Sequence, residues 1–222
     1  MTRQAALAAG LPLGFEVCEL GGRRLELACV PDLADHLDRD RLLGDPDYVP
    51  PYWALVWSGA RLLAEELARD ARLDGARVLD VGCGLGIISV AAAVAGAEVV
   101  ALDRVAAPLE FVRRSAERNG LTIHARCADL RSLDPGSSFD FVVGAELLYE
   151  RTEFDALAAG LLAQLAEGGR LIVVDARRVD TRTFYEALAR TGAREIRAET
   201  WRVREEGTLV EIRRAEYASG GR

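Results

Sequence analysis

Lysine is absent from this chain of 222 residues, in which all 28 basic side chains are arginine. The codon bias of a GC-rich genome is the simplest explanation. The 35 acidic side chains give a formal net charge of −7. An acidic balance disfavours a nucleic-acid surface, because phosphate binding normally leaves a basic patch on the protein. We therefore expect a small molecule or a protein as the partner, and no nucleic acid.

Long hydrophobic runs are also missing. The longest apolar stretch lies around residues 87–94, well short of the ~20 residues that a transmembrane helix needs. Near the N-terminus, an alanine-rich run is interrupted by Gly10, Pro12 and Glu16 before a signal peptide develops. The sequence therefore predicts no membrane span, no membrane partner and a cytoplasmic location.

The cysteines lack the Cys-x-x-Cys spacing of a zinc or redox site. The chain has four of them, Cys18, Cys29, Cys83 and Cys127, scattered along its length. This pattern is typical of small core residues in a reducing compartment. We expect no metal site.

The length of the chain allows one substantial core and is too short for two ordinary domains. We expect an N-terminal extension over residues 1–50, one domain over residues 51–216 and a disordered tail over residues 217–222. We expect a monomer.

The extension contains an expected β-hairpin. Residues 15–20 and 23–30 alternate apolar and polar side chains around a Gly-Gly pair, which is the signal of a two-residue turn. A short helix is expected over residues 32–42, followed by a proline-rich loop. Ser58 is expected to cap the next helix, whose apolar residues recur at helical spacing.

From residue 77 onward, short apolar runs alternate with helical segments. Such alternation is typical of βαβ units and a mostly parallel sheet. The expected strands lie near residues 77–82, 98–103, 123–129, 139–145 and 170–175. Two further strands, over 193–201 and 208–214, follow each other without a helix and should form an antiparallel hairpin. The sequence thus predicts an α/β, Rossmann-like domain with helices on both faces of the sheet.

A glycine-rich motif follows the first strand of this domain. Residues 78–86 read Val-Leu-Asp-Val-Gly-Cys-Gly-Leu-Gly, and glycines at the carboxyl end of a strand let a ligand approach the backbone closely. The motif departs from a dinucleotide-binding fingerprint, because Ile87 replaces its third glycine and an acid precedes the first. An extra carboxylate suits S-adenosylmethionine, which has a cationic sulfonium and amine and no phosphate. We expect this cofactor to contact Asp80, Gly82, Cys83, Gly84 and Gly86.

Two further acids end the next two strands. Asp103 lies 21 positions after Gly82, where a carboxylate can accept from both ribose hydroxyls. Asp129 is placed to accept from the adenine amino group, with Leu130 packing on the ring. We include Trp57, Arg104 and Ala145, beside these motifs, among the expected cofactor contacts.

Together these residues resemble the class I, or seven-β-strand, methyltransferases over residues 53–214. The resemblance implies the strand order 3-2-1-4-5-7-6, with the cofactor over the first two strands. Residues 51–59 (Pro-Tyr-Trp-Ala-Leu-Val-Trp-Ser-Gly) and 144–149 (Gly-Ala-Glu-Leu-Leu-Tyr) resemble segments of the family 16 protein-lysine methyltransferases. That branch includes the electron-transfer-flavoprotein β-subunit lysine methyltransferase and its bacterial relatives. Its Asp-Pro-x-Arg motif has a counterpart at 175–178, where Ala176 replaces the proline, so a role for Arg178 stays open.

The family 16 resemblance implies methyl transfer to a lysine side chain of a protein. In-line displacement needs a neutral amine that faces the sulfonium and is stripped of water. Glu146 would hold that amine and Tyr149 would line its channel, and the aromatic faces of Trp57 and Tyr149 would favour a cation. Two simpler interpretations stay open: Glu146 as an acid at the start of the next helix, and Tyr149 as a core residue.

Other functions also stay open on the same fold. A small-molecule N- or O-methyltransferase is the alternative to the lysine enzyme, because fold does not determine the substrate. A non-catalytic regulator that binds the cofactor is disfavoured, since a degenerate enzyme has no need of Asp80, Asp103 and Glu146 together.

The segment Pro50-Pro51-Tyr52 resembles the base-gripping motif of DNA adenine methyltransferases. The residue before it is Val49, which has no side-chain oxygen to accept from a base. The segment also precedes the glycine motif instead of following the fourth strand. We therefore do not adopt a DNA substrate.

Overall fold

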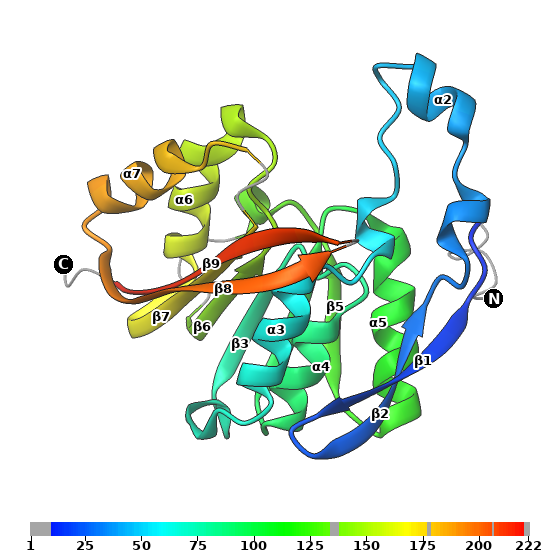
Figure 1. Cartoon of the computed structure of the whole chain (residues 1–222). Helices are drawn as coiled ribbons and strands as arrows, with labels where there is room; N and C mark the ends of the chain where they lie inside the picture. The colour runs from blue at the N-terminus through cyan, green and yellow to red at the C-terminus, as the bar shows by residue number, and fades with distance from the viewer. Residues whose placement is uncertain (1–9, 134–137, 177–178, 206, 220–222) are drawn as a thin grey trace.

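A computed structural model describes residues 10–133, 138–176, 179–205 and 207–219. Strands β1 (Gly14–Leu20) and β2 (Arg23–Cys29) form a separate antiparallel hairpin (Figure 1). Their turn residues Gly21 and Gly22 have φ values of 59° and 77°, a region that favours glycine. The expected hairpin is confirmed.

The segment after the hairpin is less regular than expected. A 3₁₀ turn, η1 (Leu33–His36), and a short helix, α2 (Arg39–Gly44), replace the single helix predicted over 32–42. The prediction is wrong because Asp38 lies outside the helix and caps α2, its carboxylate accepting from the Arg41 backbone N–H at 3.0 Å. Neither piece buries a residue, and α2 projects away from the body of the molecule (Figure 1).

The main sheet has seven strands in the order β5-β4-β3-β6-β7-β9-β8. Only the β7–β9 and β9–β8 pairs are antiparallel, so both the expected order and the closing hairpin are confirmed. The strands are β3 (Arg77–Val81), β4 (Glu98–Asp103), β5 (Ile123–Cys127), β6 (Phe139–Ala145), β7 (Leu165–Asp175), β8 (Arg194–Glu205) and β9 (Thr208–Ala218). The last three exceed the expected ranges, and β9 continues into the segment that we predicted to be a disordered tail.

Helices cover both faces of this sheet (Figure 1). One face carries α3 (Ser58–Leu67), α4 (Ile87–Val94) and α5 (Ala106–Asn119), and the other carries α6 (Phe154–Ala163) and α7 (Arg182–Arg190). Side chains alternate between the two cores as a strand requires: Val78 packs with the α3 and α4 side, whereas Leu79 packs with the α6 and α7 side. Short 3₁₀ turns connect the elements: η2 (Tyr52–Ala54), η3 (Ala71–Leu73), η4 (Leu130–Ser132) and η5 (Arg151–Glu153).

A third, smaller core joins the N-terminal extension to the domain. The ring of Trp53 lies 5.6 Å from the ring of Phe111 on α5, and both pack with Leu85 of the glycine motif. The hairpin is tied to the same helix, since the Ala28 backbone N–H donates to the Ser115 hydroxyl at 2.9 Å. The extension is therefore packed beside the glycine loop.

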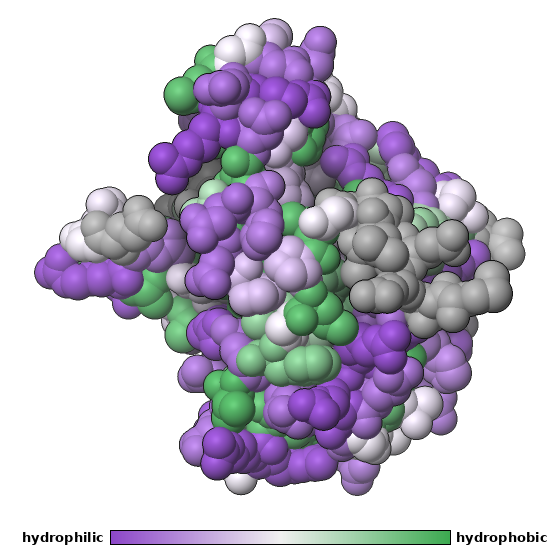
Figure 2. Space-filling model, turned by 90° about the vertical axis from the view of Figure 1, so that its right-hand side faces the viewer, coloured by the Kyte–Doolittle hydropathy of each residue, from purple (hydrophilic) through white to green (hydrophobic). Residues whose placement is uncertain are grey.

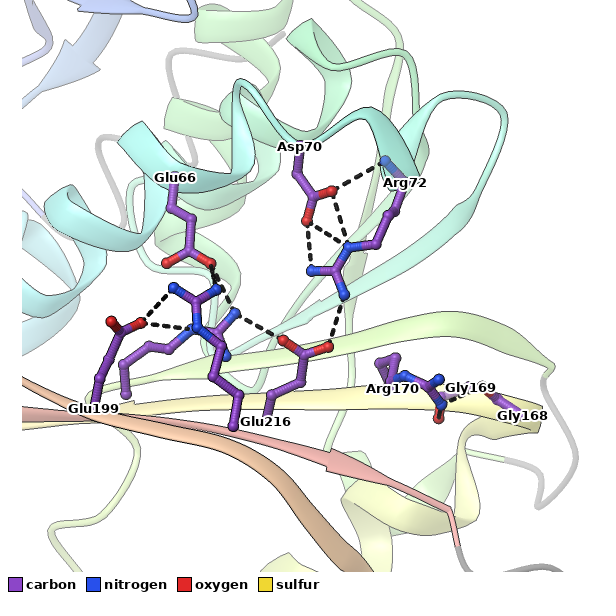
Figure 3. Close-up of polar contacts among 10 residues, drawn as sticks. Glu66, Asp70, Arg72, Gly168, Gly169, Arg170, Glu199 and Glu216 are labelled. Carbon is purple, nitrogen blue, oxygen red and sulfur yellow. Dashed lines mark hydrogen bonds and ion pairs between the residues drawn. The ribbon is translucent and has the colours of Figure 1, made fainter.

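A network of charged side chains fastens α3 to the terminal hairpin (Figure 3). Arg214 of β9 is 0% exposed and donates to Glu66 of α3 at 2.8 Å. Arg214 also pairs with Glu216 at 2.9 Å, Arg197 of β8 bonds to Glu66 at 2.8 Å, and Arg72 bonds to Glu216 at 2.8 Å. A buried arginine is costly without such partners, so the network fixes α3 against β8 and β9.

The described residues can be compared with the expectations for membrane spans, metal sites and cysteines. Within the described ranges, no helix is long and apolar enough to cross a membrane, and no group of three or more His, Cys, Asp or Glu side chains could hold a metal ion. All four cysteines are free thiols, of which Cys18, Cys29 and Cys83 are half-buried and Cys127 is exposed. The core position expected for Cys127 is wrong, because β5 is an edge strand of the sheet.

Candidate functional site

The glycine motif forms the turn between β3 and α4. Gly82, Gly84 and Gly86 have φ values of 65°, 51° and 81°, which side chains other than glycine rarely tolerate. Gly86 is the residue immediately before α4. The conformation of the turn therefore requires these glycines.

Asp103 braces this loop from the end of β4. Its carboxylate accepts from the backbone N–H of Gly84 at 3.1 Å and of Val105 at 2.9 Å. The side chain is 7% exposed. Burial raises its pKa, although the hydrogen bonds from Val105 and Gly84 act in the opposite direction. The predicted strand-end acid thus lies directly beside the glycine loop, and its contact with a ribose stays a prediction.

Asp80 lies beneath the loop, near the end of β3. It is 1% exposed and accepts a hydrogen bond of 2.6 Å from the hydroxyl of Ser89 on α4. Burial raises the pKa of Asp80 to about 7, and the charge of Asp103 adds to the shift. Burial likewise raises the pKa of the Cys83 thiol, with Asp80 and Asp103 contributing. Asp80 therefore anchors the start of α4, and direct contact with a cofactor stays a prediction.

The two acids at this loop are held by hydrogen bonds. In the part of the chain that the structure describes, neither Asp80 nor Asp103 forms an ion pair with an arginine. Burial raises the pKa of both carboxyl groups, while hydrogen bonds and, for Asp103, the nearby charge of Arg104 favour the ionised forms. Such a site suits a cationic ligand better than a pyrophosphate.

The acid after β5 has a different environment. Both carboxylate oxygens of Asp129 accept from the Arg131 guanidinium, at 2.8 and 2.6 Å, and one also accepts from the Arg131 backbone N–H at 2.9 Å. These hydrogen bonds lower the pKa of Asp129 to about 2. Leu130 is buried and packs within the α6 and α7 core. The adenine contacts predicted for this pair are not tested by these interactions.

Glu146 follows β6 and has an unusual backbone. Its φ is 56°, in the left-handed region that costs most residues about 1–2 kcal/mol. Its backbone N–H donates to the Val174 carbonyl at 2.8 Å, and its Oε2 accepts from the Ala176 backbone N–H at 3.3 Å. Its Oε1 lies beside the α-carbon of Gly59, in the first turn of α3. The next helical turn begins only at Arg151, so Glu146 is not a helix-initiating acid there.

The residues after Glu146 lie over the ends of two strands. The Leu147 side chain contacts both Gly82 and Gly144, so closely that a Cβ on either glycine would overlap it. Tyr149 is 55% exposed, which excludes the core interpretation, and the Arg104 guanidinium lies 5.8 Å from its ring centre. The sequence analysis named Leu147 and Gly144 only as parts of a motif and did not predict the contact between them.

Trp57 and Ser58 begin α3 in an unexpected way. Trp57 occupies the N-cap position, and no side-chain hydrogen bond caps the helix, so the expected Ser58 cap is wrong. The indole of Trp57 donates to the Tyr52 carbonyl at 3.1 Å. A Cβ on Gly84 would lie 3.1 Å from the Trp53 carbonyl oxygen. The segment before α3 therefore packs against the glycine loop.

A cavity of about 640 Å³ lies elsewhere on the domain. Its lining includes Arg77, Val100, Ile123 and Phe139, which lie near the beginnings of β3, β4, β5 and β6. The glycine loop lies at the opposite, carboxyl ends of these strands, where open α/β sheets bind their ligands. We therefore assign the candidate site to the loop. Ala145, at the end of β6, shares this edge of the sheet, whereas Arg178 lies outside the described residues.

Comparison with known proteins agrees with this geometry. Residues 78–169 match the model of a family described as a methyltransferase domain. A ubiquinone biosynthesis O-methyltransferase of Bradyrhizobium sp. (strain ORS 278) is 33% identical over 121 residues, which cover 54% of this chain and 47% of that protein. The chain thus spans about half the length of the curated relatives that it matches.

Solved structures share the fold at low sequence identity. The N-methyltransferase NodS from Bradyrhizobium japonicum WM9, in complex with S-adenosyl-L-homocysteine, is 19% identical with a TM-score of 0.59, over 73% of this chain and 88% of that one. The [4+2]-cyclase SpnF is 20% identical with a TM-score of 0.61, over 73% and 82% of the two chains. A cyclase on this fold illustrates that architecture alone does not determine the reaction.

The family match begins on β3, includes the whole glycine loop and ends in β7. It therefore contains the braced loop, Asp103 and the strained Glu146, within a sheet of the predicted order. Over residues 78–169 the chain is therefore similar to methyltransferase domains, and its fold is that of the solved structures named above.

Proposed function

We propose that this protein transfers the methyl group of S-adenosylmethionine to a nucleophilic oxygen or nitrogen of a small molecule. The observation that carries the proposal is the pair of buried carboxylates, Asp80 and Asp103, at a glycine loop without an arginine partner among the described residues. A sulfonium cofactor would bring the positive charge that these groups lack. The activity of the whole protein is a proposal, because its relatives match over about half their length.

The residues at the strand ends fit the parts of this cofactor. Asp103 would accept from the ribose hydroxyls, Asp129 would accept from the adenine amine through lone pairs that Arg131 does not use, and the backbone of Gly82 and Gly84 would face the methionine portion. When bound, the cofactor supplies an activated methyl group on its sulfonium. The protein supplies binding, orientation and exclusion of water.

Glu146 is the residue best suited to the acceptor. Its carboxylate is held between the ends of β6 and β7 and the first turn of α3. A carboxylate there would accept from an N–H or O–H group of the acceptor and orient its lone pair. Exposed Tyr149 would line the entrance. A small-molecule acceptor is favoured by the relatives, which are named for ubiquinone biosynthesis.

A lysine side chain of a protein is the second candidate. The Glu-x-x-Tyr motif at 146–149 favours it, as does the arm over residues 32–47, which carries six aspartates and two arginines. Leu43 on this arm is 88% exposed, and Figure 2 shows the arm at the top of the molecule as mainly hydrophilic with hydrophobic spots. An acidic, partly apolar arm complements a basic partner.

Calorimetric titration with S-adenosylmethionine tests the cofactor. The wild-type protein should bind it, and Asp103→Ala should weaken binding on the order of a hundredfold or more, since one carboxylate serves two hydroxyls and also braces the loop. Thermal unfolding checks that the variant is folded. Equal affinity in a folded Asp103→Ala protein would exclude the ribose assignment.

Methyl-labelled cofactor incubated with a lysate of the source organism tests the acceptor. Label in the small-molecule fraction is the expected result. Label in a protein band would instead support the lysine candidate. Label in neither fraction, despite cofactor binding, would contradict both candidates and favour the non-catalytic regulator. With a lysine enzyme, activity should rise with pH toward the lysine pKa of about 10.4.

A further inference from the structure

The backbone conformation of residue 59 does not require glycine. Gly59 is buried in the first turn of α3, and its φ is not in the left-handed region that requires glycine. Glycine inside a helix costs about 1 kcal/mol relative to alanine. The space around its α-carbon is therefore the feature to explain.

That space is occupied by the Glu146 side chain. A Cβ on Gly59 would overlap Oε1 of Glu146, and it would lie 2.8 Å from Cγ1 of Val174 and 3.3 Å from Cδ of Glu146. Real Cβ atoms essentially never lie within 3.0 Å of another heavy atom, so Oε1 of Glu146 and Cγ1 of Val174 would both have to move. The Glu146 carboxylate therefore occupies the space that a side chain at position 59 would fill.

The rest of the structure holds Glu146 in this place. The Ala176 backbone N–H donates to Oε2 at 3.3 Å, and the Glu146 backbone N–H donates to the Val174 carbonyl at 2.8 Å. Its left-handed φ of 56° is a strain that persists only where surrounding contacts impose it, commonly at functional sites. The N-terminal end of α3 adds a positive partial charge that favours the carboxylate.

We propose that Gly59 is a positioning residue for methyl transfer, acting by keeping open the space that the Glu146 carboxylate needs at the start of α3. This inference rests on the proposed function, in which Glu146 contacts the methyl acceptor. Gly59 itself touches neither acceptor nor cofactor. A displaced carboxylate would hold the acceptor off the line of attack, and a misplacement of about 1 Å can cost on the order of a hundredfold in rate.

The test compares Gly59→Ala in two backgrounds, using the acceptor found by the labelling experiment. In the wild-type background the substitution should lower kcat at least about tenfold and leave cofactor affinity within about threefold. In the Glu146→Asp background the shorter side chain leaves room for the new methyl group, so the same substitution should lower kcat by less than about threefold. Gly192→Ala, in the turn between α7 and β8, where a Cβ meets nothing within 4 Å, is the glycine-to-alanine control and should leave kcat unchanged.

The activity of two variants distinguishes a failure of the positioning role of Gly59 from a failure of the proposed contact between Glu146 and the acceptor. If Glu146→Gln is as active as wild type, the proposed contact between Glu146 and the acceptor fails. If Glu146→Gln is inactive but Gly59→Ala is fully active, or costs the same in both backgrounds, the positioning role of Gly59 is overturned.

A further variant keeps the test informative if Gly59→Ala folds poorly. Val174→Ala removes the other atom that the new Cβ would meet. The Gly59→Ala/Val174→Ala protein should fold, as judged by thermal unfolding, and should remain impaired in kcat. Full recovery of kcat would show that contact with Val174, and not with Glu146, is what matters, and would contradict the proposal.

Discussion

The two ends of α3 both meet charged side chains, but in opposite ways. At Gly59, the helix contacts one carboxylate whose residue has a strained φ of 56° and whose side chain accepts at 3.3 Å from Ala176. At Glu66, the helix contacts two arginines at 2.8 Å, one of them fully buried. The Glu66 end is built from short charged hydrogen bonds that join α3 to β8 and β9. The Gly59 end retains strain, as sites selected for function do.

The largest effect on stability should come from removing the buried arginine. Arg214→Met removes the fully buried partner of Glu66 and Glu216 and leaves each acid with one half-exposed arginine. Breaking a buried ion pair costs about 3–5 kcal/mol. Urea unfolding should show this loss, while kcat at saturating cofactor changes only a few-fold. Arg202→Met is the control, since its pair with Glu211 has side chains 66% and 46% exposed and should contribute about 0–1 kcal/mol. Equal losses in both variants would contradict the comparison.

A smaller effect should appear at the same end of α3 on acidification. Burial opposes ionisation of Glu216, but hydrogen bonds from Arg72 and Arg214 prevail and lower its pKa below the usual value. A lowered pKa in the folded state contributes stability above the unfolded-state pKa, and this contribution is lost as pH falls through the folded-state value. The stability difference between wild type and Glu216→Gln should therefore be largest near neutral pH and shrink toward pH 3. A difference that grows on acidification would reverse the sign of the shift.

At the Gly59 end of α3, the backbone of Glu146 predicts that glycine is a more stable replacement for Glu146 than alanine. At most positions alanine is the more stable substitution, but at a φ of 56° glycine avoids a strain of about 1–2 kcal/mol. Glu146→Gly should therefore be about 1 kcal/mol more stable than Glu146→Ala in urea unfolding. Both variants lose the same carboxylate contacts, so each controls for the other. If alanine is the more stable, Glu146 is not held in the left-handed region.

Much of the fold followed from local patterns in the sequence. Alternating apolar runs and helical segments predicted the strands, and the glycine motif with Asp103 predicted the loop that Asp103 now braces. The contacts at both ends of α3 were not predicted, because they join residues far apart in the chain, such as Gly59 with Glu146 and Glu66 with Arg214. Nothing in a local pattern distinguishes a buried arginine from the other 27 basic residues.

The smallest effect should come from Ser58, the residue that sequence reasoning assigned to the helix cap. Removing a true N-cap serine costs about 0.5–2 kcal/mol, but here Trp57 holds the N-cap position and no side-chain hydrogen bond caps α3. Ser58→Ala should change the free energy of unfolding by less than about 0.3 kcal/mol. Glu146→Gln should cost more, about 0.3–1 kcal/mol, because it removes a negative charge from the N-terminal end of the same helix. Urea unfolding of the two variants in parallel decides between them: a larger loss for Ser58→Ala would mean that the serine, and not the distant carboxylate, stabilises the start of α3.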